Sequence, residues 1–257
     1  MAVRRNAALA KLRAGEAIFG PALIFGSADL AEQVALLGFD FVWLDWQHGE
    51  NDEATLKNQV ARFRGLETIP LPRVKWNEPG TIGRTLDTGA MGVIVPMIET
   101  PEEAAAAVQA AFYPPKGRRS GGGVRLGLLA DSEDEYLRRG SDEILLVVMV
   151  ESEAAIGRID AIMKVPGVDV VLIGPGDLML DLESRGKGAA EHERLCLEVA
   201  RASKATGVAA GYVCGSAEIA KRRLEQGFRF INWGLDHHCV VEGLGRVLAT
   251  CRSWTAG

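Results

Sequence analysis

Short apolar runs alternate with amphipathic segments along almost the whole chain. The runs are rich in Val, Ile and Leu, a pattern typical of strands buried on both faces of a parallel sheet. The segments between them have helical spacing, as at Leu30, Val34 and Leu37. The predicted strands cover Ile18 to Phe25, Phe39 to Leu44, Ile69 to Val74, Gly92 to Pro96, Leu145 to Val150, Val168 to Ile173, Val208 to Val213 and Phe230 to Trp233.

Eight strands that alternate with helices predict a single (β/α)8 TIM barrel over residues 1–257. Residues suited to begin helices lie between the runs, and we expect this role for Asp29, Asn51 and the pair Thr100-Pro101. No linker rich in Pro, Gly or Ser divides the chain, which favours one domain over two.

Composition and charge argue against some classes of partner and location but do not identify the function. The net charge is −5, which argues against a nucleic-acid or acidic-membrane partner. The basic start, Met1 to Lys11, is not followed by the apolar core of a signal peptide, and no apolar run is long enough to cross a bilayer, so we expect a cytoplasmic protein. The four cysteines lack metal-site spacing and are expected to be buried free thiols rather than a disulfide or zinc site: Cys196, Cys214, Cys239 and Cys251.

Polar side chains gather where the predicted strands end. The run Phe41 to Leu44 stops at Asp45, and His48 follows three residues later. In a (β/α)8 barrel the carboxyl ends of the strands form one rim that carries the active site. The chemically capable residues expected at this rim are Asp45, His48, Arg73, Glu151 and Asp177.

Glu151 and Asp177 follow neighbouring strands, the fifth and the sixth. Adjacent strands lie about 5 Å apart, so the two carboxylates could share one hard cation such as Mg2+ or Mn2+. The alternative is that Glu151 caps the next helix and Asp177 makes a loop hydrogen bond. We favour the metal because both residues fall on one rim.

Arg73 places a permanent positive charge in an apolar strand, where it needs an anion. That anion is either a substrate carboxylate or enolate, which we favour, or an internal partner, Asp45 or Glu50. The segment Ile173 to Leu178 contains two glycines around a proline and would expose N–H groups at Gly176 and Asp177, which suits either a bound carboxylate or a tight turn.

These residues lie in motifs that together resemble the HpcH/HpaI family of metal-dependent pyruvate aldolases. The similarity runs through nearly the whole chain in the same order. The motifs are Asp45-Trp46-Gln47-His48, Arg73-Val74-Lys75-Trp76-Asn77-Glu78-Pro79, Gly92-Val93-Ile94-Val95-Pro96-Met97, Tyr113-Pro114-Pro115-Lys116-Gly117-Arg118-Arg119, Val150-Glu151-Ser152 and Ile173-Gly174-Pro175-Gly176-Asp177-Leu178.

The resemblance implies a barrel of the phosphoenolpyruvate/pyruvate-binding type and class II aldol chemistry. It implies a divalent cation (Mg2+, Mn2+ or Co2+) at Glu151 and Asp177, and an enolate stabilised by Arg73. It also implies that the backbone at Gly176 and Asp177 binds the pyruvate carboxylate, and that His48 with Asp45 manages protons. The expected reaction is cleavage of a 4-hydroxy-2-oxo acid to an aldehyde and pyruvate, or a close analogue such as hydroxypyruvate.

The chain departs from the family pattern beside the expected site. Trp46-Gln47 stands where members often have Gly-Glu, and Met149 stands where many have Gln. Met179 and Leu180 replace small residues. Because these changes make the pocket bulkier and more apolar, we expect Trp46 and Met149 to contact the substrate and the aldehyde to be an unusual one.

Other polar residues have less specific expectations. The loop Arg118 to Arg125 is either a mobile lid whose arginines reach an acidic aldehyde or a solvated connector. We expect His192 at the surface, and His237 and His238 at a helix start with a structural role more than a place at the rim.

The last segment, Val240 to Trp254, has an apolar face. The resemblance implies that this helix packs on a neighbouring subunit of a homo-oligomer, plausibly a hexamer. Two other functions stay open: a CoA-ester lyase of the citrate-lyase β type or decarboxylating carbon–carbon bond former of the same superfamily, and a non-catalytic barrel that binds an oxo acid.

Overall fold

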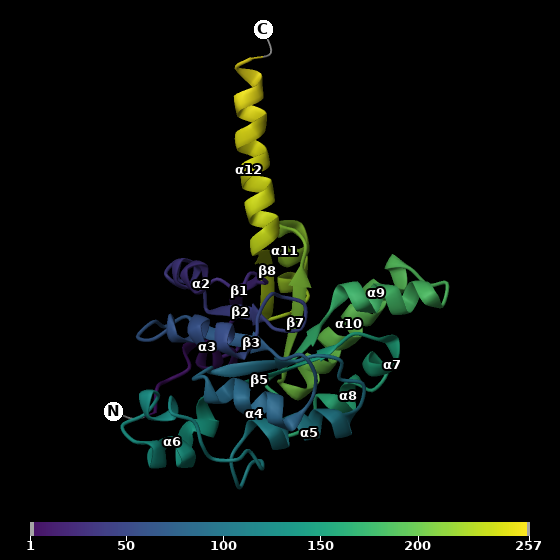
Figure 1. Ribbon diagram of the computed structural model, residues 1–257. Helices are drawn as coiled ribbons and strands as arrows, with labels where there is room; N and C mark the ends of the chain where they lie inside the picture. The colour runs from purple at the N-terminus through teal and green to yellow at the C-terminus, as the bar shows by residue number, and fades with distance from the viewer. Residues whose placement is uncertain (1–2, 256–257) are drawn as a thin grey trace.

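The eight predicted strands close into one barrel in the computed structural model, which describes residues 3–255. Neighbouring strands are parallel and follow the order of the chain, with the last strand pairing to the first. The predicted (β/α)8 class is therefore confirmed (Figure 1). The strands are β1 (Ile18–Leu23), β2 (Phe41–Asp45), β3 (Ile69–Arg73), β4 (Gly92–Val95), β5 (Leu145–Val150), β6 (Val170–Ile173), β7 (Ala209–Cys214) and β8 (Phe230–Leu235).

Helices connect the strands and cover most of the barrel wall (Figure 1). The α-helices are α1 (Ala7–Arg13), α2 (Ala28–Ala35), α3 (Glu53–Ala61), α4 (Pro79–Asp87), α5 (Pro101–Ala111), α6 (Glu133–Arg139), α7 (Glu153–Ile156), α8 (Ile159–Ile162), α9 (Pro175–Ser184), α10 (Ala189–Thr206), α11 (Ala217–Glu225) and α12 (Asp236–Ser253). Two short 3-10 helices, η1 (Leu126–Leu128) and η2 (Gly140–Glu143), flank α6.

The expected helix starts are right in one case and shifted in two. Thr100 caps α5 in a full capping box, with the proline in the first turn. Ser27, not Asp29, caps α2, and Asp52, not Asn51, caps α3. In both misses the true cap is the neighbouring polar residue whose side chain accepts a hydrogen bond from the backbone three residues later.

Apolar side chains fill the inside of the barrel. Phe41 and Phe230 stack across β2 and β8 with ring centroids 4.3 Å apart. Leu9 and Leu12 of α1 belong to the same buried cluster and close the barrel at the amino ends of the strands. Since the interior is packed, a ligand can reach only the ends of the barrel, and in this fold the active site is at the carboxyl rim.

The loop Arg118 to Arg125 cannot be a lid over that rim. It follows α5, which returns the chain to the amino ends of the strands. Gly123 lies against Asp87 at the end of α4, and Arg125 lies beside Gly89, just before β4. The lid interpretation is wrong, because the loop and its arginines occupy the end of the barrel opposite to the strand carboxyl ends.

Two further expectations need correction. His192 is buried, with only 6% of its surface exposed, and its imidazole contacts Cys196 and Tyr212. The charged residues around it in sequence lie on the other face of α10, which hid its inward position. All four cysteines are free as expected, but only Cys196 and Cys214 are buried, while the two cysteines of α12 are exposed.

The α12 helix projects away from the barrel and touches it only at its base, against β1 and β8 (Figure 1). Along it, Val240, Val241, Leu244, Val247 and Leu248 are each 45–66% exposed. No helix within residues 3–255 is both long and apolar enough to cross a membrane.

We expect Asn6→Ala to destabilise the fold strongly. Asn6 is fully buried; its side-chain oxygen caps α1 at Leu9, and its amide group donates to the carbonyls of Met91 and Glu143. Losing the cap and leaving the Glu143 carbonyl unsatisfied should lower the free energy of unfolding by about 2–4 kcal/mol. Urea unfolding at fixed protein concentration measures this.

Ser27→Ala is the control, because Ser27 caps α2 at the exposed surface and makes no buried hydrogen bond. It should cost only about 1 kcal/mol. Equal losses in the two variants would show that the buried amide contacts of Asn6 contribute nothing.

Candidate active site

An ion pair at the carboxyl ends of β2 and β3 forms the floor of the site. Asp45 and Arg73 are register partners in the sheet. Arg73 donates from Nε to Asp45 Oδ1 at 3.0 Å and from Nη2 to Oδ2 at 2.5 Å. Both side chains are at most 8% exposed. The anion that the buried guanidinium requires is therefore the internal partner Asp45, which was the less favoured of the two sequence interpretations.

The pairing leaves one edge of the guanidinium without a carboxylate. The Arg73 guanidinium lies over the Trp43 ring, 4.7 Å from the ring centroid. Trp43 therefore holds the face of the guanidinium, and Asp45 holds one side of it. Its remaining nitrogen, Nη1, lies 3.9 Å from the Met149 sulfur inside the barrel mouth. A charged donor group in a fixed orientation is thus available to a ligand at the rim.

His48 stands in a tight loop that Asp45 organises through its main-chain contacts. Asp45 Oδ1 accepts hydrogen bonds from the backbone N–H groups of Gln47 and His48, and Asn51 donates to the Asp45 carbonyl at 2.7 Å. A side chain at Gly49 would meet that carbonyl at 2.3 Å, so the turn requires glycine. This arrangement places an exposed imidazole at the rim.

The expected Asp45/His48 dyad is not formed. Within the described residues, no hydrogen bond joins the His48 imidazole to the Asp45 carboxylate, whose oxygens accept from Arg73 and the loop backbone. The reason is the register of β2 and β3, which gives Asp45 a stronger cationic partner than a histidine side chain. Asp45 is thus a positioning residue for Arg73 and for the loop.

Glu151 lies at the end of β5 with 4% of its surface exposed. It does not cap α7, because Ser152 does so. Its Oε2 accepts from the backbone N–H of Met97 at 2.9 Å. Met97 has a φ of 57°, a conformation unfavourable for a residue with a side chain, and strained backbone of this kind gathers at functional sites. Sequence reasoning gave Met97 no role, since nothing in its side chain indicates one.

Burial raises the pKa of Glu151 to about 7. The neighbouring charge of Asp177 raises this pKa further, whereas the Met97 N–H group and the charge of Arg73 lower it. Glu151, Asp177 and Arg73 therefore lie within electrostatic reach of one another, as the sequence predicts for one rim.

Asp177 sits in the first turn of α9, exposed to solvent. In the part of the chain that the structure describes, no side chain caps this helix. The N–H groups at its start, including those of Gly176 and Asp177, therefore face the rim without an internal partner there. Open space surrounds the position of Gly176. The helix start is therefore suited to an anionic ligand group.

Gly174 allows Glu151 to lie where it does. A Cβ atom at Gly174 would be 2.6 Å from Glu151 Oε1 and 3.0 Å from the Met149 methyl group. Met149 is thus placed beside Glu151 and Arg73, as expected for a residue that lines the pocket.

Trp46 does not lie at the barrel mouth with Met149. It packs in the cluster between the barrel wall and the outer helices, with Leu44 and Leu56 among its members, and the Lys75 ammonium lies 5.1 Å from its ring. Because side chains alternate along a strand, Asp45 faces the mouth and Trp46 faces outward. The expected substrate contact of Trp46 is not supported by this position.

His237 and His238 begin α12 just beyond β8, with ring centroids 4.0 Å apart. Asp236 before them accepts hydrogen bonds from the N–H groups of Ile24 and Phe25. These contacts join β8 to the end of β1 and agree with the structural role expected for a helix start.

The donor groups present fit a hard divalent cation. Glu151 and Asp177 supply carboxylate oxygens, and their mutual repulsion would be relieved by a positive charge between them. Within residues 3–255 no group of three or more His, Cys, Asp or Glu side chains could hold a metal. A cation here would therefore have two protein ligands and keep its other positions for water and substrate oxygens.

Charged residues converge at the carboxyl ends of the barrel strands, where (β/α)8 enzymes have their active sites, so the fold and the site together define an enzyme. The family model for HpcH/HpaI aldolase/citrate lyase matches residues 23–243. The chain belongs to this family, whose aldolases depend on a divalent metal.

Individual relatives are similar to this chain over nearly their full length. The chain is 33% identical to the hydroxypyruvate/pyruvate aldolase of Roseovarius nubinhibens, over 94% of this chain and 95% of that one. It is 33% identical to a 4-hydroxy-2-oxo-heptane-1,7-dioate aldolase of Escherichia coli, over 90% and 89% of the two chains. The crystal structure of an HpcH/HpaI family protein from Burkholderia cenocepacia superposes with a TM-score of 0.89 at 30% identity, covering 96% of this chain and 99% of that one.

We expect Gly174→Ala to displace the Glu151 carboxylate and so weaken binding of a divalent cation. The steric overlap at 2.6 Å cannot be relieved without moving Glu151 or the start of α9. Mn2+ affinity, measured by electron paramagnetic resonance on chelator-treated protein, should fall about tenfold or more, as when a group that orients a metal ligand is lost.

Gly176→Ala is the matched control, because it adds the same methyl group two residues further along, where no atom lies within 4 Å. Its Mn2+ affinity should match that of the wild type. If Gly174→Ala bound Mn2+ equally well, Glu151 would not be a metal ligand.

Proposed function

We propose that the protein is a metal-dependent pyruvate aldolase. It cleaves a 4-hydroxy-2-oxo acid to an aldehyde and pyruvate, or a close analogue such as hydroxypyruvate. The observation that carries the proposal is the free edge of Arg73, held in place by Asp45 and Trp43, beside the Glu151–Asp177 carboxylates. Both aldolase relatives named above support the reaction class.

Glu151 and Asp177 would hold the cation, for which Mg2+, Mn2+ and Co2+ are the candidates. When bound, the cation supplies Lewis-acid polarisation of the substrate's oxygen atoms. The exposed N–H groups of Gly176 and Asp177 bind the substrate carboxylate at the start of α9, where the helix dipole favours negative charge.

Arg73 stabilises the charge that develops in the reaction. As the C3–C4 bond of the substrate breaks, its electrons move to the keto group and give the pyruvate enolate. Arg73 Nη1 faces this oxygen, and because Asp45 and Trp43 fix the guanidinium in advance, little reorganisation is needed. Protonation of C3 then gives pyruvate.

His48 is the candidate base for the 4-hydroxyl proton. His48 is exposed at the rim, and its imidazole has no carboxylate partner among residues 3–255, so it can reach a substrate that enters from solvent. Met149 lines the same mouth and supplies an apolar wall, which favours an aldehyde with an apolar part. Full aldolase and proton-exchange rates in His48→Ala would remove this residue from the mechanism.

Proton exchange tests enolate formation without knowledge of the aldehyde. We expect the metal-loaded protein to exchange the methyl protons of pyruvate with D2O, followed by proton NMR. In Arg73→Lys the exchange rate should fall about 100- to 1000-fold, the usual effect of losing one donor to a developing oxyanion. Lysine keeps the positive charge but not the fork that pairs with Asp45 and presents Nη1.

Arg73→Ala is less suitable, because it leaves the buried carboxylate of Asp45 unpaired and should cost about 3–5 kcal/mol of stability. Lys75→Ala is the control, since Lys75 lies over Trp46 on the outer side of the barrel. Exchange that persists in Arg73→Lys would contradict the role of Arg73. No exchange with any of the three metals would favour a CoA-ester lyase, for which CoA-thioester cleavage is the direct assay.

The proposal includes assembly into a homo-oligomer through α12, and the resemblance makes a hexamer the expected form. The apolar face of α12 is uncovered, and so is the outer wall of β1 and β8, where Phe19 is 42% and Trp233 49% exposed. In a (β/α)8 barrel a helix normally covers this wall. The α12 helix of a second copy would bury both surfaces.

Leu244→Asp/Leu248→Asp should disrupt this assembly, because it places two charges on the apolar face of α12. Size-exclusion chromatography with light scattering should show smaller particles. Arg246→Asp changes the net charge by the same amount, but Arg246 pairs with Glu242 on the polar face, so its assembly should be unchanged. A wild-type monomer, or a double variant that assembles normally, would rule out this interface.

A cytoplasmic location is also part of the proposal. It is supported by the free state of the four cysteines, two of them exposed on α12, as expected in a reducing compartment.

A further inference from the structure

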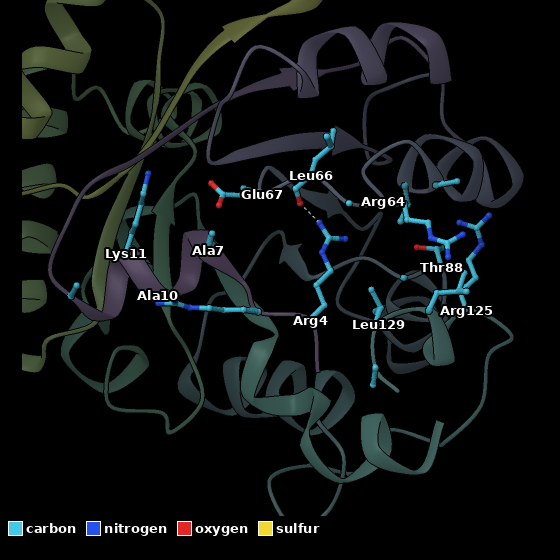
Figure 2. A pocket seen from close by; sticks show the side chains of 18 of the residues that line it. Arg4, Ala7, Ala10, Lys11, Arg64, Leu66, Glu67, Thr88, Arg125 and Leu129 are labelled. Atoms are coloured by element: carbon cyan, nitrogen blue, oxygen red, sulfur yellow. Dashed lines mark hydrogen bonds between the residues drawn. The ribbon is translucent and has the colours of Figure 1, made fainter. Parts of the chain in front are cut away.

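A cavity lies at the end of the barrel opposite to the candidate active site. It has a volume of about 820 Å3, within the range of small-molecule sites. Its walls come from α1 and from segments that precede β1, β3, β4 and β5, so it lies at the amino ends of the strands. Figure 2 shows the side chains that surround it.

The cavity combines an apolar floor with an excess of positive charge. The apolar floor is formed by alanines of α1 and by Leu66, Leu128 and Leu129. Five basic residues line it against two acidic ones, Glu16 and Glu67; the basic residues are Arg4, Arg5, Lys11, Arg64 and Arg125. Such a balance attracts anions and excludes cations.

Two of the basic residues already have partners. Arg4 donates to the carbonyls of Phe63 and Leu66, and Lys11 pairs with Asp40 at 2.6 Å. Arg64 and Arg125 differ: within residues 3–255 no hydrogen bond or ion pair engages either guanidinium. Figure 2 shows both side chains beside Thr88. Two like charges directed into one hollow repel each other unless an anion lies between them.

Helix ends offer a simpler explanation for part of this charge. Arg64 follows the end of α3, and Thr88 ends α4, so a positive charge there complements the carbonyl ends of both helices. That effect can explain why each helix end has a positive charge, but it does not explain the concave apolar floor between the two arginines. Arg125 comes from a different segment of the chain, yet it lies close to α3. A Cβ atom added at Gly89 would be within 3.9 Å of both Arg125 and Val60, and Val60 belongs to α3.

We propose that this cavity binds a phosphorylated small molecule whose apolar part rests on the alanine and leucine floor. One guanidinium satisfies a carboxylate, whereas a phosphoryl group has enough oxygens to bridge two. Arg64 and Arg125 hold the phosphoryl group. The ligand is not the aldolase substrate, since the packed barrel interior separates the two ends.

The test is a fluorescence anisotropy titration of the full-length protein in its native assembly with N-methylanthraniloyl-ADP. EDTA is present throughout, so that the candidate metal site cannot hold a metal–diphosphate complex. The wild type should bind the probe saturably, and inorganic diphosphate should displace it. N-methylanthraniloyl-adenosine, which lacks the phosphates, should bind at least about tenfold more weakly.

Arg64→Gln/Arg125→Gln should weaken probe binding by at least about tenfold while leaving pyruvate proton exchange unchanged. The matched control is Arg138→Gln/Arg139→Gln, which removes the same charge from the surface of α6. No saturable binding, or equal losses in the two double variants, would overturn the proposal. Displacement by succinate as effective as by diphosphate would reject the phosphate class, and displacement by oxalate would move the probe to the opposite end of the barrel.

Discussion

The register between β2 and β3 sets up the whole candidate site. It places Asp45 opposite Arg73, and the pair is buried, so each side chain depends on the other to avoid an uncompensated charge. Asp45 also accepts hydrogen bonds from the loop that carries His48. One carboxylate thereby fixes both the cationic donor and the candidate base. A shift of one strand by one residue would turn its charged side chain toward the outer helices and break the pair.

The fold was predictable from sequence because its signal is repeated. Each buried strand is a short run of Val, Ile and Leu, and an error of two residues at one end, as at Phe39 or Val168, does not change the number of strands or their direction. The rim residues followed from the same reasoning, because a parallel barrel brings all carboxyl strand ends together. Glu151, Asp177 and Arg73 lie within electrostatic reach for this reason alone.

The sequence could not show which of several nearby side chains at one end of the barrel pair with one another. Asp45 could bind His48 or Arg73, and only the register between two strands decides. His192 looked exposed because its neighbours in sequence are charged, yet a helix turns every third or fourth side chain inward. For the loop ending at Arg125 the sequence left a lid and a solvated connector open, because its glycines and arginines suit either one, and the position of the loop at the amino ends of the strands excludes the lid.

The two ends of the barrel use arginine in different ways. At the carboxyl end Arg73 is almost fully buried, paired to Asp45 and held over Trp43, so that one donor edge remains in a fixed position. At the amino end Arg64 and Arg125 lie around an open cavity, with no hydrogen-bond or ion-pair partner among residues 3–255. A transition state needs donors that are already oriented, whereas a site that takes up a ligand from solvent gains more from charge that the ligand itself neutralises. The same side chain thus suits catalysis where a carboxylate restrains it and ligand uptake where none does.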